Sequence, residues 1–298
     1  MTRRWPGPDG LDTPVVGLGG GPLGNYQRAI TDEDAISTVE AAWAGGIRYF
    51  DTAPFYGAGL AERRLGRALR GRPRGDYVLS TKVGRLVRPG PGAGPSVFLG
   101  PPTDHCVWDF SADGVRRSLD DSLGRLGVDR VDVVFIHDPY DHGEAALDEA
   151  YPALAALRAE GVVSAIGVGM GDAAMLARFV AETDLDVVMI AGRYTLLDDV
   201  AGAELLPRCL ERGVSAICVS LFDGLLAGGV HTGPRHSGRA ERVLAACRER
   251  GVPVAAAAMR FPLTHPAVAG IAIGCHTADQ VRANLAAFHQ PLPPDLFS

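Results

Sequence analysis

Eight short runs of apolar and β-branched residues recur along the chain, separated by longer segments with helical spacing of apolar positions. The runs are nearly continuously apolar, which is typical of strands covered by other elements on both faces. They span residues 14–19, 47–51, 77–82, 131–137, 162–168, 186–191, 214–219 and 268–274. We therefore expect each run to form one strand of a buried sheet.

The intervening segments carry the start and stop signals of helices. Residues 31–46 begin with Thr31 as an N-cap, continue with acidic residues and end in glycine, and residues 111–128 begin with Ser111 as a cap. A similar helical pattern recurs in residues 146–161, 172–183, 203–213 and 278–288. Helices are thus expected to fill the gaps between strands.

Strand–helix units in series, with no break in composition, predict an α/β fold in which residues 1–298 form a single (β/α)8 TIM barrel. The alternative is an open, doubly wound sheet. The stretch "GLGGGPLG" has the glycines of a dinucleotide-binding turn. However, residues 25–30 separate it from the first expected helix, which weakens that fingerprint.

Two stretches rich in glycine and proline, residues 84–110 and 223–238, are expected to be long loops at the C-terminal face of the barrel. The first ends in His105, Trp108 and Phe110, which are suited to the wall of a substrate site. We therefore interpret it as a lid over the barrel mouth.

Bulk composition is that of an ordinary globular protein, with 298 residues, 47% hydrophobic and 21% charged. A net charge of −6 gives no reason to expect a nucleic-acid partner. No apolar run reaches the 18 residues of a spanning helix, and the N-terminus lacks the apolar core of a signal peptide. The helix surfaces show no additional apolar stripe, so we expect a monomer or weak homodimer.

Five widely spaced cysteines without a CxxC pair argue against a disulfide framework or a zinc site. A reducing, cytoplasmic location is the expectation. No metal site is predicted, because a metal-dependent barrel hydrolase would need several ligands on strand ends. His137 and the following Asp138 are the two that qualify.

Polar side chains close three consecutive predicted strands. The second strand ends at Asp51, with Tyr56 just beyond; the third ends at Lys82 and the fourth at His137. In a parallel barrel these ends converge on one mouth, where the chemistry of such folds is found. Each residue alone could be a solvated strand end, a cap or a packed aromatic. Together, the four predict an active site.

The motifs "FDTAPFYG", "LSTKVG" and "VFIHDP" resemble those of the aldo-keto reductases. More narrowly, "IRYFDTAPFYGAGLAERRLGRALR" and "AGRYTLL" are similar to the aldose 1-dehydrogenase branch, which includes L-fucose, L-galactose and pyridoxal dehydrogenase-like enzymes. The resemblance covers nearly the whole chain. It implies a nicotinamide-dependent oxidoreductase that acts on a sugar hemiacetal, alcohol, aldehyde or ketone.

The same resemblance implies a role for each member of the tetrad Asp51, Tyr56, Lys82 and His137. Tyr56 would exchange the proton, Lys82 and Asp51 would support it, and His137 would orient the substrate oxygen. A free tyrosine titrates near pH 10, so we expect the Lys82 ammonium, within ~4–6 Å, to lower the pKa of Tyr56. Asp51 would keep the buried lysine charged.

An extended NAD or NADP across the barrel mouth is the cofactor that the resemblance implies. The matching positions are Gly169, Met170, Tyr194, Phe222, Asp223, Gly224, Leu225, His276, Thr277, Gln280 and Asn284. Tyr194 would stack on the nicotinamide, and backbone amides of 222–225 would hold the pyrophosphate. Many NADP-using relatives have arginine where this chain has Gln280, which favours NAD; His276, Thr277 and Arg282 leave NADP open.

Phe55, His105, Trp108 and Tyr140 are the candidate substrate residues. Tyr140 stands where sugar-handling relatives often carry an acid, which leaves open a less polar carbonyl substrate of a specialised biosynthetic pathway. A cofactor-sensing binding protein with little turnover is a further alternative, although the full tetrad argues against it.

Overall fold

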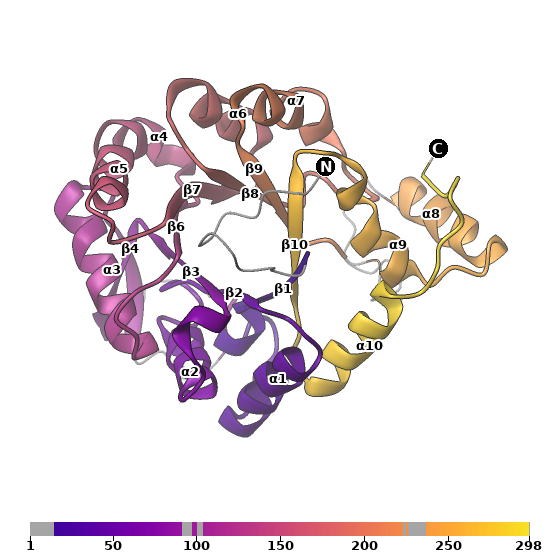
Figure 1. Ribbon diagram of the computed structural model, residues 1–298, viewed down its shortest axis with the longest axis horizontal. Coiled ribbons are helices and arrows are strands. Elements are labelled where there is room, and N and C mark those ends of the chain that lie inside the picture. Colours follow the sequence, from indigo (N-terminus) through magenta and orange to yellow (C-terminus); the bar gives the residue numbers. More distant parts are fainter. Residues whose placement is uncertain (1–14, 91–96, 100–103, 223–224, 226–236, 298) are drawn as a thin grey trace.

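A closed barrel of eight parallel strands forms the centre of the molecule in the computed structural model, which describes residues 15–90, 97–99, 104–222, 225 and 237–297 (Figure 1). Each predicted apolar run overlaps one barrel strand. Around the barrel, the strands are β1 (Val16–Gly19), β10 (Val268–Gly274), β9 (Ser215–Val219), β8 (Val187–Ala191), β7 (Ala165–Met170), β6 (Val133–His137), β3 (Val78–Val83) and β2 (Tyr49–Asp51). Of these, β3 and β7 extend one and two residues beyond their runs. Pairing of β1 with β2 closes the ring, which confirms the (β/α)8 barrel and excludes the open sheet.

Helices surround the barrel, and the predicted caps are in place (Figure 1). The Thr31 side chain accepts from the Asp34 N–H and the Asp34 carboxylate accepts from the Thr31 N–H, while Ser111 accepts from the Gly114 N–H. The helices are α1 (Asp32–Ala44), α2 (Leu60–Leu69), α3 (Ala112–Leu126), α4 (Gly143–Ala145), α5 (Tyr151–Ala159), α6 (Ala173–Glu182), α7 (Leu205–Arg212), α8 (Ser237–Glu249), α9 (Val254–Arg260) and α10 (Ala278–Phe288).

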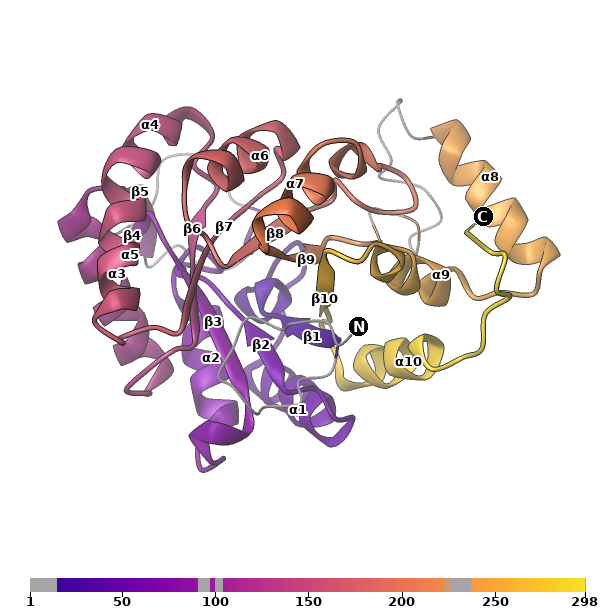
Figure 2. The ribbon, with the colours of Figure 1, turned by 45° about the horizontal axis from the view of Figure 1, so that its top comes forward.

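Single turns link several of these elements. A π-helical turn, Ala146–Ala150, precedes α5, and 3-10 turns span Gly21–Gly24, Arg74–Asp76, Tyr140–His142, Val200–Gly202 and Pro262–Thr264. Figure 2 shows α8 at the outer edge of the molecule, beyond α9. None of the described helices combines the length and apolar character needed to cross a lipid bilayer. All five cysteines are free.

The stretch 84–110 differs from the expected irregular loop, because its two ends pair as an antiparallel hairpin. Strands β4 (Arg85–Pro89) and β5 (Asp104–Trp108) place Arg85 opposite Trp108 and turn Leu86 into the interior. Between them, residues 97–99 lie against the loop after β1: Tyr26 bridges Phe98, and the Gln27 N–H donates to the Val97 carbonyl at 2.8 Å.

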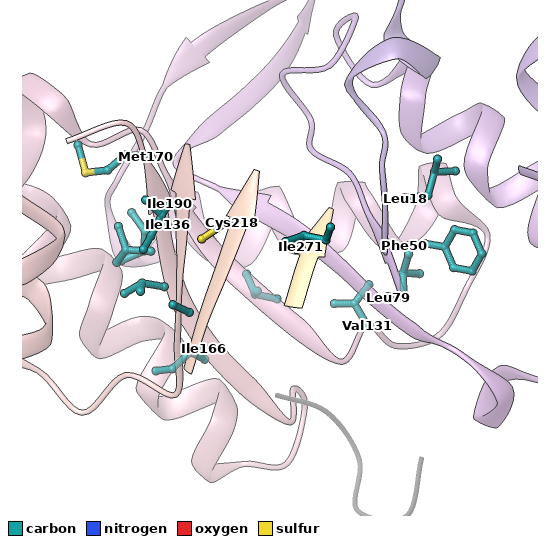
Figure 3. Close-up of a cluster of buried hydrophobic side chains, with 14 of the residues drawn as sticks. Leu18, Phe50, Leu79, Val131, Ile136, Ile166, Met170, Ile190, Cys218 and Ile271 are labelled. Atoms are coloured by element: carbon teal, nitrogen blue, oxygen red, sulfur yellow. The ribbon is translucent and has the colours of Figure 1, made fainter. Parts of the chain in front are cut away.

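Alternation along each strand divides the core into two layers. Outward-facing residues such as Phe50, Leu79, Ile136 and Ile166 pack beneath the helices (Figure 3). Inward-facing residues fill the barrel: Tyr49, Val78, Val133, Phe135, Ala165, Val187, Met189, Ile217 and Ala272. Asp51, Lys82 and His137 each lie at an even spacing from an inward-facing residue on the same strand. Their side chains therefore also point inward, at the C-terminal end of the barrel.

Candidate active site

A cavity of about 690 Å³ opens at the C-terminal ends of the strands, within the size range of small-molecule sites. All four residues of the predicted tetrad line it: Asp51, Tyr56, Lys82 and His137. They come from β2, the loop after β2, β3 and β6. The barrel thus brings together side chains that are up to 86 positions apart in the sequence (137 − 51 = 86).

Lys82 and Asp51 form an ion pair at the base of the cavity. The Lys82 Nζ lies 2.6 and 2.8 Å from the two Asp51 oxygens and donates to the Thr52 carbonyl at 2.8 Å. The two side chains are 1% and 3% exposed. Burial lowers the pKa of Lys82, but Asp51 and Tyr56 more than offset this, and the net pKa is raised. Lys82 is therefore an ammonium group at neutral pH.

Two hydroxyl groups extend this ion pair into the barrel interior. The Ser80 Oγ donates to Asp51 Oδ1 at 2.7 Å and lies 2.9 Å from the Tyr49 hydroxyl. Burial raises the pKa of Tyr49 well above its usual value, so this phenol stays protonated. The Tyr49 ring fits because Gly17 faces it: a Cβ there would lie 2.2 Å from Tyr49 Cδ1.

Tyr56 stands above the ion pair, with the Lys82 Nζ 4.9 Å from its ring centre. Burial raises the pKa of Tyr56 more strongly than the Lys82 ammonium lowers it, so the net pKa lies above its usual value. This corrects the expectation of a lowered pKa, because the sequence reveals the neighbouring cation but not the loss of solvent. Tyr56 is consequently a neutral phenol near pH 7, which can donate a proton.

His137 completes the group, with its ring 5.8 Å from that of Tyr56 at an interplanar angle of 87°. Burial, followed by the positive charges of Lys82 and Arg85, lowers the pKa of His137 well below its usual value. The ring is therefore neutral and can donate through one nitrogen. Its Nδ1 is buried without a hydrogen-bond partner among the described residues, and its Nε2 lies 3.5 Å from Asp138 Oδ2.

Four of the predicted cofactor residues, Gly169, Met170, Phe222 and His276, line the cavity. Tyr194 does not line it, and its stacking on the nicotinamide stays a prediction. Its ring packs against Phe261 at 5.2 Å and faces His265.

The other predicted cofactor residues that the structure describes have structural partners. The Leu225 N–H donates to the Phe222 carbonyl at 2.5 Å, so this amide is already used within a turn. Thr277 caps α10, the Gln280 side chain accepts from the His276 N–H at 2.7 Å, and Asn284 donates to Cys275 Sγ. Asp223, Gly224 and most of the predicted loop 223–238 lie outside the described residues.

Of the predicted substrate residues, Phe55 lines the cavity, whereas His105, Trp108 and Tyr140 do not. His105 Nδ1 contacts the Gly90 carbonyl across the hairpin, and Trp108 stacks on Phe110. The Tyr140 hydroxyl accepts from the Gly171 N–H.

Sequence reasoning missed other parts of the cavity wall, among them Tyr26, Gln27, Val97 and Phe98, and considered Asp138 only as a possible metal ligand. The segment 84–110 thus contributes through Val97 and Phe98 rather than through His105 and Trp108. For Asp138, its place next to His137 was an available signal; for the others, only the pairing of distant loops brings them to the cavity.

The cavity can accommodate an extended nicotinamide dinucleotide. Gly19, Gly21, Gly169 and Gly274 line its wall, so backbone replaces side chains along part of its length. A Cβ on Gly274 would approach Pro22 Cγ to 3.0 Å and narrow this side. Within the described part of the chain, no cluster of three or more His, Cys, Asp or Glu residues could hold a metal ion.

Comparison with known proteins agrees with this geometry. The model of the Aldo/keto reductase family matches residues 15–298. The chain is 42% identical to a D-threo-aldose 1-dehydrogenase of Pseudomonas sp, over 97% of this chain and 93% of that protein. It is 36% identical to a pyridoxal 4-dehydrogenase of Microbacterium luteolum, with 99% and 95% covered. An aldo-keto reductase from Bacillus halodurans in its holo form superposes with a TM-score of 0.75 at 26% identity, covering 99% and 94%.

Proposed function

This chain belongs to the aldo/keto reductase family and is an NAD(P)-dependent oxidoreductase, and on that basis we propose that it oxidises or reduces the C1 carbon of a sugar or related hydroxy-aldehyde. One observation carries the proposal: Asp51, Tyr56, Lys82 and His137 face a single cavity that is open at the barrel mouth. Bound NAD(H) or NADP(H) would supply or accept the hydride.

The side chains of the tetrad bind the substrate oxygen and transfer the proton. His137, as a neutral donor, holds the substrate oxygen; Tyr56 gives a proton to that oxygen in reduction and takes it back in oxidation. The Lys82 ammonium stabilises the phenolate that Tyr56 becomes after donation. Asp51, held by Ser80, keeps Lys82 charged in a site from which water is largely excluded.

NAD is the proposed cofactor in preference to NADP. Gln280 is neutral and its side-chain oxygen is bound to the His276 N–H. The nearest arginine in the first turns of α10, Arg282, is paired with Asp279 at 2.6 Å. A 2′-phosphate would have to compete with that carboxylate for a guanidinium group. Among the described residues around the start of α10, His276 lines the cavity and could contact the phosphate.

The substrate class follows from the two similar dehydrogenases, one of which acts on D-threo-aldoses and the other on pyridoxal. Both names point to an aldehyde or hemiacetal carbon. The edge-to-face pair of Phe55 and Phe98, 5.2 Å apart, gives the cavity an apolar side and supports reduction of an aryl aldehyde as a second candidate. We also propose that the chain acts as a single barrel, as a monomer or weak homodimer, and, given its five free cysteines, in the cytoplasm.

A spectrophotometric panel tests this proposal. The purified protein is mixed with NAD or NADP and a set of aldoses, and with NADH or NADPH and a set of aryl and aliphatic aldehydes, with and without a chelator. We expect sustained turnover with an aldose or aldehyde, faster with the NAD pair and insensitive to chelation. A single burst of one cofactor per chain without further turnover would instead identify a cofactor-sensing protein.

A further inference from the structure

Asp138 places a second carboxylate in the wall of the cavity, directly after His137. Successive residues of a strand point to opposite sides, so a continued β6 would turn Asp138 away from the barrel interior. Instead its φ is 49°, a left-handed conformation that asparagine and aspartate adopt more readily than most residues. Its N–H donates to the Gly169 carbonyl at 2.9 Å. As a result, His137 and Asp138 both line the cavity.

Arg85 holds this carboxylate from behind. Its Nη2 donates to Asp138 Oδ2 at 3.3 Å, and its guanidinium lies between the rings of Phe55, at 3.8 Å, and Trp108, at 3.7 Å. The hairpin sets this arrangement, because Arg85 on β4 pairs with Trp108 on β5. Trp108 therefore contributes to the site through Arg85, although it does not reach the cavity.

The carboxylate of Asp138 retains acceptor capacity toward the cavity. Among the described residues, the bond from Arg85 is the one hydrogen bond that its side chain accepts, whereas an ionised carboxylate has about four acceptor positions. Burial raises the pKa of the Asp138 carboxyl group, and the neighbouring Arg85 guanidinium and Lys82 ammonium offset part of this rise. A donor group on a ligand can therefore bind here without displacing Arg85.

We propose that Asp138 accepts a hydrogen bond from a substrate hydroxyl on the carbon adjacent to the reacting carbon, and thereby selects hydroxy-aldehydes and sugars over plain aldehydes. His137 binds the reacting oxygen, and Asp138 Oδ2 is 3.5 Å from His137 Nε2. An oxygen on the next carbon of the substrate is thus within reach of the carboxylate. Arg85 acts as a positioning residue. The inference rests on the proposed function, whose substrate class it narrows.

Glycolaldehyde and propanal provide the test, because they have the same number of non-hydrogen atoms and differ by a hydroxyl in place of a methyl group. The ratio of their kcat/KM values is measured for the wild type, for Asp138→Asn and for Asp141→Asn. Asp141 is exposed, lies three residues away and does not line the cavity. Asparagine tolerates the same backbone conformation, so Asp138→Asn should fold; a melting curve checks this.

We expect Asp138→Asn to lower the glycolaldehyde-to-propanal ratio about 10- to 100-fold, the usual effect of a hydrogen bond to a charged group. Asp141→Asn should leave the ratio as in the wild type, and Arg85→Gln should lower it in the same direction as Asp138→Asn. A ratio in Asp138→Asn within about threefold of the wild-type value would overturn the inference, whether both rates fall together or neither does. A wild-type protein inactive on every aldehyde would overturn the proposed function itself.

Discussion

Replacing Asp51 with asparagine removes the counter-charge of a buried lysine while preserving the shape of the side chain. In the wild type, Asp51 accepts two hydrogen bonds from Lys82 and one from Ser80. After the change, Lys82 keeps the Thr52 carbonyl as a partner. The ammonium then loses its ionic partner in a position that is 1% exposed.

The magnitude follows from the burial of this pair. Removing one partner of a buried ion pair costs about 3–5 kcal/mol, because the other charge stays uncompensated. At roughly 1.5–2 °C per kcal/mol for a chain of this size, the Tm should fall by roughly 5–10 °C. Activity should fall by about 10²–10⁴, since burial without the Asp51 carboxylate lowers the pKa of Lys82 and so weakens the cation that stabilises the phenolate of Tyr56.

The direction in which the Tm difference changes with pH distinguishes the loss of the ion pair from a general disruption of the fold. In the wild type the pKa of Lys82 is raised, so its contribution to stability is complete below the unfolded pKa of about 10.4 and is lost above the folded pKa. In Asp51→Asn, burial lowers the pKa of Lys82, and the variant gains stability as rising pH neutralises the amine. The difference in Tm should therefore be largest near neutral pH and narrow toward pH 10.

Thermal melts of the wild type, Asp51→Asn, Lys82→Met and the double variant, monitored by circular dichroism across this pH range, measure the effect. The double variant should recover much of the stability lost in Asp51→Asn, because it removes both charges. Asp129→Asn, at a side chain that is 85% exposed, serves as the control for net charge. A Tm of Asp51→Asn within about 2 °C of the wild type at neutral pH would refute the reasoning.

Three further changes test other parts of the account. Because the pKa of Tyr56 is raised, reduction should be nearly independent of pH up to about pH 9, whereas oxidation should accelerate with pH as the phenolate fraction grows; steady-state rates in both directions check this. Gly17→Ala should displace Tyr49 and lower the free energy of unfolding by about 1–3 kcal/mol, as measured by denaturant titration. It should also lower kcat in the activity assay. Arg64→Ala should lower the free energy of unfolding by roughly 2–4 kcal/mol and raise the KM for cofactor, because Arg64 donates to the carbonyls of Leu23 and Ile30 around the cavity-lining loop. Replacing the exposed Arg67 with alanine should have a much smaller effect on both quantities.

The barrel could be predicted from the sequence because its signal is local and repeated. Each strand is an apolar run, and Thr31 and Ser111 cap helices where expected. The proposed catalytic tetrad was indicated by the same pattern, since Asp51, Lys82 and His137 close strands that otherwise bury apolar residues and Tyr56 follows the first of these strands. Inward parity then fixes their direction, as the pairs Tyr49–Asp51 and Phe135–His137 illustrate.

The remaining features depend on distant contacts. The hairpin of residues 85–89 and 104–108 was hidden by the glycine and proline residues between its strands. Phe98 reaches the cavity because it pairs with Tyr26, 72 positions earlier (98 − 26 = 72). No local sequence pattern indicates that pairing. The contact between Tyr194 and Phe261 could not be predicted either, because an aromatic ring in a loop can pack against a ligand or against protein neighbours. The pKa of Tyr56 was misjudged because desolvation depends on the finished fold.

Replacement of Tyr56 with phenylalanine tests the central claim most directly, because it removes one oxygen from the cavity and keeps the ring that packs against His137 and Phe98. Turnover is measured with the best substrate of the panel, and cofactor binding is measured by fluorescence titration. We predict a fall in kcat of about 10²–10⁴ with cofactor affinity close to that of the wild type. A kcat within about threefold of the wild type would contradict proton transfer by Tyr56.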